Sequence, residues 1–85
     1  MIIYLTKGNI ITPIRELNNT QVQYWKYGQE CAYIGGGLMP GTQLIVEEVN
    51  KTPGMMWIRA AIPHSDPTKY LKISGEEYAL NFKLI

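Results

Sequence analysis

The side chains best suited to chemistry in this sequence are aromatic rings that carry polar atoms. The chain has six Tyr and two Trp against a single Phe, so most of its rings can hydrogen-bond as well as pack. Such rings suit surfaces that are both apolar and hydrated, and Tyr, Trp and Arg concentrate at binding hot spots. Here they gather in two short runs, residues 24–27 and 55–59.

Alternation along an extended strand decides which of these rings share a face. We expect Trp25 to lie with Tyr27, and Trp57 to lie with Arg59, each pair opposite an aliphatic face. In a closed barrel these pairs point to solvent, where they would stack on bases, contact cations or hold a protein partner. In a sandwich or a homo-oligomer they are buried against another sheet or subunit. The sequence leaves both open and favours a ligand or partner surface.

Three adjacent glycines, Gly35, Gly36 and Gly37, form the second candidate site. Backbone amides in a glycine-rich bend can cradle an anion. A phosphate-binding loop, however, needs Lys and Ser/Thr after its last glycine and then a helix, whereas Gly41 is followed by Thr42 and a predicted strand. We therefore expect mainly a structural bend, with the three glycines helping to form the ligand surface.

Catalytic and metal-binding patterns are weak. His64 stands beside Ser65 and Asp66, but a hydrolytic triad is assembled across space and not from consecutive loop residues. Structural zinc needs three or four Cys/His ligands, and the chain offers only Cys31 and His64. The carboxylate pairs at 47–48 and 76–77 are expected to be surface or capping residues. We predict no catalytic residue, no metal site and no cofactor.

The elements that must position these residues are short strands separated by Gly, Pro and Asn. A chain of 85 residues is enough for one domain, 1–85, with a thin core. Turns are expected at 7–9 and 50–54, and Thr12 and Pro13 could open a helical turn. The predicted strands are 1–6, 10–14, 21–27, 31–34, 42–49, 55–62, 69–74 and 80–84.

The core face of these strands follows from their alternation. Leu44 and Val46 are expected to face one way, with Ile45 and Val49 facing the other. Leu71 and Ile73 should point inward. The predicted core side of 55–62 is the aliphatic one: Met56, Ile58, Ala60 and Ile62. Residues 74–77 have the Ser-x-x-Glu form of a capping box, which predicts a short helical turn before the last strand.

From residue 42 onward the predicted order is strand, turn, strand, proline-bounded loop, strand, short helical turn, strand. This order resembles the second half of small SH3-like barrels, an architecture without a sequence motif. The resemblance implies a mostly β fold, a small antiparallel β-barrel of five to seven strands with one or two short helical turns.

Charge and cysteine content narrow the function. A net charge of +1 gives none of the positive field expected of a protein that binds duplex phosphates over a broad surface. A single cysteine and no targeting signal favour the cytoplasm. We expect a non-enzymatic, homo-oligomeric binding module that blocks a host protein or sequesters a small nucleotide-like ligand. It resembles the viral and mobile-element accessory proteins that act as inhibitors. The alternative is a single-stranded nucleic-acid binder whose backbone contacts come from Lys26, Arg59, Lys69 and Lys72.

Overall fold

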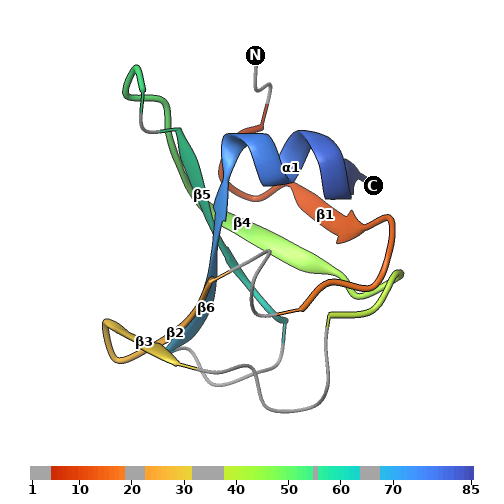
Figure 1. Cartoon of the computed structure of the whole chain (residues 1–85), viewed down its shortest axis with the longest axis horizontal. Helices are drawn as coiled ribbons and strands as arrows, with labels where there is room; N and C mark the ends of the chain where they lie inside the picture. Colours follow the sequence, from red (N-terminus) through yellow and green to blue (C-terminus); the bar gives the residue numbers. More distant parts are fainter. Residues whose placement is uncertain (1–4, 19–22, 32–37, 55, 64–67) are drawn as a thin grey trace.

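A computed structural model describes residues 5–18, 23–31, 38–54, 56–63 and 68–85 (Figure 1). These ranges form one antiparallel sheet of seven strands in the order β3-β2-β6-β5-β4-β1-β7, with one α-helix, so the predicted mostly β fold is confirmed. The elements are β1 (Ile10–Pro13), β2 (Gln23–Lys26), β3 (Gln29–Cys31), β4 (Leu44–Asn50), β5 (Trp57–Ala61), β6 (Lys69–Ser74), α1 (Gly75–Asn81) and β7 (Phe82–Leu84). Among them no helix is long and apolar enough to span a membrane.

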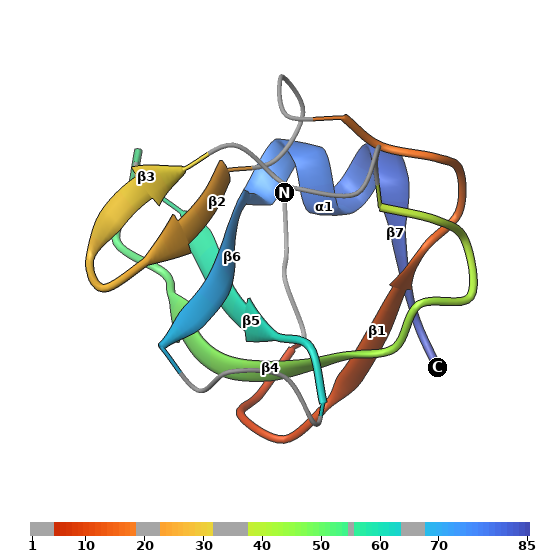
Figure 2. The same ribbon diagram turned by 90° about the horizontal axis from the view of Figure 1, so that it is seen from below.

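The sheet curls strongly around one interior (Figure 2). β4 joins its two parts: Leu44 and Ile45 pair with β1, and Ile45, Val46 and residues 48–50 pair with β5. α1 lies across the gap between β6 and β7, the strands it connects (Figure 2). Within the described residues β3 and β7 are not paired with each other, so the sheet is open and the expected closed barrel is not confirmed.

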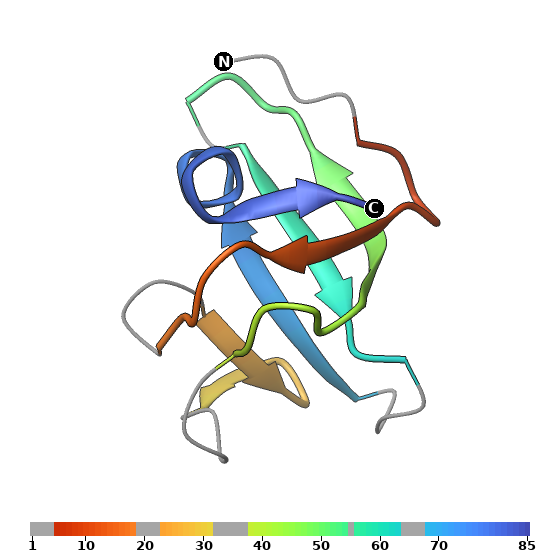
Figure 3. The same ribbon diagram turned by 90° about the vertical axis from the view of Figure 1, so that its right-hand side faces the viewer.

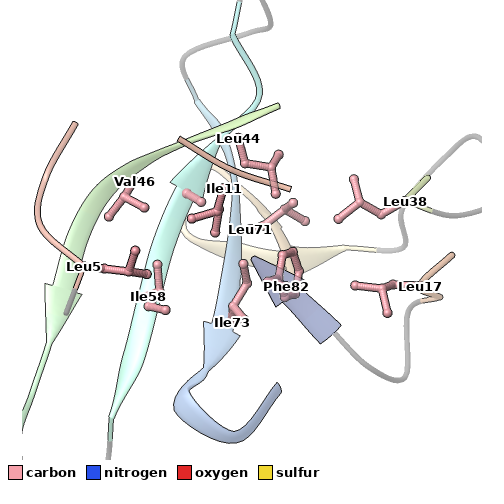
Figure 4. Packing of buried hydrophobic residues seen from close by; sticks show 11 residues of the cluster. Leu5, Ile11, Leu17, Leu38, Leu44, Val46, Ile58, Leu71, Ile73 and Phe82 are labelled. Carbon is pink, nitrogen blue, oxygen red and sulfur yellow. The ribbon is translucent and has the colours of Figure 1, made fainter. Parts of the chain in front are cut away.

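The core is the concave side of this sheet (Figure 4). Ile58 and Ala60 are fully buried, as expected for the aliphatic side of β5, with Met56 and Ile62 packed against them. Leu71 and Ile73 are also fully buried, which confirms the predicted inward face of β6. The other buried apolar residues of the cluster are Leu5, Ile11, Leu17, Leu38, Leu44, Val46 and Phe82.

A β-bulge interrupts the alternation of β4. Val46 lies opposite Ala60, but the next pair is Glu48 with Arg59, so Glu47 is an extra residue. The bulge returns Val49 to the inner side, where it packs against the core. The expectation that Val49 shares a face with Ile45 is therefore wrong, because strict alternation does not continue through a bulge.

The N-terminal region differs from the expected helical turn. Thr12 and Pro13 belong to β1 and pair with Lys83 and Phe82 of β7. The Thr12 hydroxyl, which is buried, accepts a hydrogen bond from the Gly41 amide at 3.0 Å. Strand pairing and this bond together hold the segment extended, so the helical turn does not form.

The predicted turn before β1 is present. The Asn9 amide donates to the Thr6 carbonyl at 3.1 Å, and Gly8 has a φ of +96°, which glycine adopts without strain. Leu5 and Thr6 are not in a strand, and residues 1–4 lie outside the described ranges. Of the predicted strand 31–34, only Cys31 is described.

The N-cap of the predicted capping box is confirmed, and the helical turn that it predicts is present. The Ser74 hydroxyl accepts a hydrogen bond from the Glu77 amide at 3.1 Å. The helix then runs to Asn81, whose side-chain amide donates to the Glu77 carboxylate at 2.5 Å. The last strand therefore starts at Phe82 and not at Leu80, because the helix is longer than the single turn expected.

The cap can be tested by substitution. Ser74→Ala should lower the free energy of unfolding by about 1 kcal/mol, because the Glu77 amide loses its acceptor. Ser74→Asp should preserve stability, since Asp is an equally good cap. Urea denaturation of the three proteins is the measurement. An equal loss of stability in both variants would show that the loss does not come from the hydrogen bond of the cap.

Candidate functional site

Five side chains form a patch on the outer side of β2, β6 and β5, which we call the aromatic face. Alternation places them opposite the core, because inward residues such as Leu71 and Ile58 are fully buried. All five are partly buried. The aromatic face consists of Trp25 from β2, Tyr70 and Lys72 from β6, and Trp57 and Arg59 from β5.

Contacts connect these five side chains across three strands. Trp25 lies opposite Tyr70 in the β2–β6 register, with ring centroids 6.2 Å apart and planes within 9°. The Lys72 ammonium lies 5.5 Å from the Trp25 ring centroid and 4.9 Å from that of Trp57. The Arg59 guanidinium lies 3.8 Å from the Tyr70 ring centroid. Each such cation–π contact contributes about 0.5–1 kcal/mol at an exposed site, so the patch is held in shape by its own side chains.

A carboxylate from the β4 bulge lies at the edge of this patch. The Arg59 Nε lies 3.3 Å from Oε1 of Glu47, the bulged residue. The two side chains are 37% and 40% exposed, so the ion pair adds little to stability. Its effect is positional, because it holds the guanidinium from the side away from Tyr70.

Sequence reasoning found part of this arrangement. Trp57 and Arg59 share a face of β5, as alternation predicted. The structure also brings Trp25 of β2 to the same patch, through Lys72 of β6. Tyr70 was missed, and Lys72 was considered only as a phosphate contact. The signal was present, because inward Leu71 and Ile73 require outward residues at 70 and 72.

Tyr27 is not on the aromatic face, which corrects its predicted pairing with Trp25. β2 ends at Lys26, which pairs with Gln29, so Tyr27 and Gly28 form a two-residue hairpin loop. Their φ angles are +55° and +76°, as a type I′ turn requires. Tyr27 is 71% exposed, and left-handed backbone costs a residue other than glycine about 1–2 kcal/mol. An exposed ring therefore occupies a position better suited to Asn.

The cations proposed for nucleic-acid binding are divided between two faces. Lys26 lies opposite Lys69 in register, in phase with the inward residues Tyr24 and Leu71 and not with Trp25. Glu30 lies opposite Trp25, and Glu48 lies opposite Arg59, so both carboxylates are on the outer side. The outer side of the sheet thus carries both signs of charge.

The other candidate residues from the sequence, and the possible metal and titratable groups, do not extend the aromatic face within the described residues. Gly35, Gly36, Gly37 and His64 lie outside the described residues. Within the described residues no three His, Cys, Asp or Glu side chains are grouped as a metal site would need. Burial raises the pKa of Tyr78 above its ordinary value of 10.0, but this ring packs on Phe82 beside α1.

Comparison with protein-family models, with curated proteins and with solved structures gives no match. The chemistry of the aromatic face is therefore the basis for assigning a function.

The turn at Tyr27 gives a prediction. Tyr27→Asn should raise the free energy of unfolding by about 1 kcal/mol, because Asn tolerates positive φ better than Tyr. Tyr27→Phe keeps the same backbone strain and should leave stability unchanged. Urea denaturation compares the three. A less stable Tyr27→Asn would show that packing of the ring outweighs the strain at this loop.

Proposed function

We propose that the protein is a non-enzymatic binding module that holds a protein partner on the aromatic face and acts by blocking it. The observation that carries this proposal is the contact network from Trp57 through Lys72, Trp25 and Tyr70 to Arg59, on the side of the sheet away from the core. Trp, Tyr and Arg are the residues most enriched among binding hot spots.

Preorganisation supports this role. Binding normally costs about 0.5–1.5 kcal/mol for each flexible side chain that it immobilises. Lys72 already lies against two rings, and Arg59 lies between Tyr70 and Glu47. A partner would meet side chains that are largely ordered in advance.

Shape favours a protein over a small nucleotide-like ligand. Small-molecule sites are concave and enclose most of the ligand. The outer side of the curled sheet is convex (Figure 2), and strand alternation places the aromatic face on that side. A hollow of about 390 Å³ adjoins the face at Arg59 and Glu47, but neither Trp25 nor Trp57 lines it. A convex patch suits another macromolecule, with the rings and cations as central contacts.

Charge favours a protein over single-stranded nucleic acid, the alternative function. A single nucleic-acid strand that stacked its bases on the aromatic rings would pass Glu30 beside Trp25. It would also pass Glu47 and Glu48 beside Arg59. Lys26 and Lys69 lie in phase with the core side, so they would not follow the same strand. Mixed charge of this kind suits the rim of a protein interface.

We also propose that the curled sheet is a small SH3-like barrel. The supporting observation is the order β4, β5, β6, α1, β7, in which α1 directly precedes a last strand that pairs with β1. The proposed cytoplasmic location and the likeness to viral and mobile-element accessory proteins rest on the sequence.

The binding test uses Trp57→Ala and Tyr27→Asn as a matched pair. Both remove an aromatic ring, but Tyr27 is an exposed residue of the β2–β3 turn outside the aromatic face. The tagged proteins are expressed in the native host, and retained proteins are identified by quantitative mass spectrometry. The partner is then purified, and its affinity for each variant is measured by calorimetry. Trp57→Ala should weaken binding by about 2 kcal/mol, as hot-spot residues do, and Tyr27→Asn should not.

Three outcomes would contradict the proposal. Equal retention of the partner by both variants would remove the aromatic face from the interface. Homo-oligomers in native mass spectrometry that dissociate in Trp57→Ala would make the face a subunit contact. Retained nucleic acid whose affinity falls about 10³-fold or more between 50 and 200 mM salt would favour the alternative.

A further inference from the structure

Among the described strands, none pairs with the outer edge of β7. Within the described residues β7 pairs with β1 alone and forms one end of the sheet (Figure 3). The Ile85 amide donates to the Ile10 carbonyl at 2.9 Å, so residue 85 directs its backbone groups toward β1. Alternation along the strand then directs the backbone N–H and C=O of Leu84 away from β1, toward the open edge.

Exposed apolar side chains concentrate around this edge. Of the seven large apolar side chains that are exposed among the described residues, six lie in or beside β1, β7, the end of α1 and the 39–41 loop. They are Ile10, Ile14, Met39, Leu80, Leu84 and Ile85, with exposed fractions from 36% to 64%. Such concentration marks an interaction surface, whereas scattered exposed residues do not.

A groove of about 400 Å³ lies over β1, between the 39–41 loop and β7. Its lining includes Ile14, Pro40, Lys83 and Leu84, and the hydrogen bond from the Gly41 amide to Thr12 holds the loop that forms one wall. The opposite edge strand, β3, is equally short and also carries one charge, Glu30, but of the large apolar side chains exposed among the described residues only Tyr27 lies beside it. A charge on a short edge strand discourages added strands, and at β7 a carboxylate opposite Lys83 would offset that effect.

We propose that the β7 edge binds an extended, acidic segment of a partner protein as an added antiparallel strand. Main-chain hydrogen bonds to Leu84 would supply affinity, as in other cases of strand addition. Alternate residues would supply specificity, with a carboxylate facing Lys83 and apolar side chains facing Phe82 and Leu84. The site lies at the other end of the sheet from β2 and β3 and does not depend on the aromatic face.

Charge favours an acidic segment over a second copy as the occupant. The two like-charge pairs within the described sheet, Lys26–Lys69 and Arg59–Lys72, each have a compensating ring or carboxylate contact. In symmetric antiparallel pairing, the fullest overlap of two three-residue strands is centred on the middle residue, which is Lys83 in β7. Lys83 would then lie opposite Lys83 of the second copy, and like charges directly opposite are destabilising. Arg15, whose Nη2 donates to the Leu80 carbonyl at 3.4 Å, adds a second cation beside the end of α1. An acidic segment complements both charges.

The probe is a blocked synthetic heptapeptide of alternating valine and aspartate, titrated into the ¹⁵N-labelled chain and followed by NMR. We expect saturable shifts confined to β7, β1 and the groove, and slower hydrogen exchange at the Leu84 amide. Lys83→Glu should weaken binding about tenfold, and a valine–lysine peptide should bind this variant better than it binds the original chain. A peptide N-methylated on its bonding edge should not bind.

Leu84→Pro provides a second variant. It removes the amide that faces the open edge but leaves the bond from Ile85 to Ile10 in place, so it should lose peptide binding and keep its fold by NMR. Absence of shifts, unchanged binding by Lys83→Glu, or equal binding of the N-methylated peptide would overturn the proposal. Sedimentation of the protein without peptide tests for self-association. A dimer that Leu84→Pro dissociates would overturn the proposal, because the edge would then bind a second copy of the chain and not a partner segment.

Discussion

The structure depends on one constraint: a single sheet must bury its own inner side. Its described strands have no second sheet against them, so the sheet curls until β1 and β7 face β5 and β6 across one cluster of aliphatic side chains. The central inward positions of β5 and β6 are then needed for the core, as the complete burial of Ile58, Leu71 and Ile73 shows. The large rings of Trp25 and Trp57 lie on the outer side, where they contact neighbouring side chains.

Two local irregularities give the outer side its particular form. The bulge at Glu47 places a second carboxylate, Glu48, opposite Arg59, while Glu47 keeps its ion pair with the same guanidinium. The two-residue turn at Tyr27 and Gly28 closes the β2–β3 hairpin and directs an aromatic ring into solvent. Both are departures from ideal strand geometry, and the bulge also turns Val49 toward the core. Binding residues in small β proteins are often positioned in this way, since the core tolerates little variation.

Much of the fold was predictable because it follows from local patterns. The inward faces of β5 and β6, the turn before β1 and the Ser74 cap each depend on a few neighbouring residues. The bulge in β4 and the strand conformation of Thr12 and Pro13 depend on partners distant in sequence, so alternation and turn signals did not reveal them. Trp25, Trp57 and Arg59 could be recognised from local patterns of residue type. Their connection through Lys72 and Tyr70 could not, because it depends on the order of the strands in the sheet. Tyr27 was misplaced because a one-residue difference in where a hairpin turns changes the direction of its side chain.

The pairing of β1 with β7 has a consequence for how the chain reaches this structure. β1 is the first strand of the described sequence and β7 is the last, yet Ile11 lies opposite Leu84. During synthesis, β1 can pair with β4 well before β7 has left the ribosome, and Phe82 is missing from the core until then. Closing so long a loop is entropically expensive, and folds dominated by such distant pairings fold slowly, in about milliseconds to seconds. The hairpins from β4 to β6 need no such closure, so they are the natural place for folding to begin.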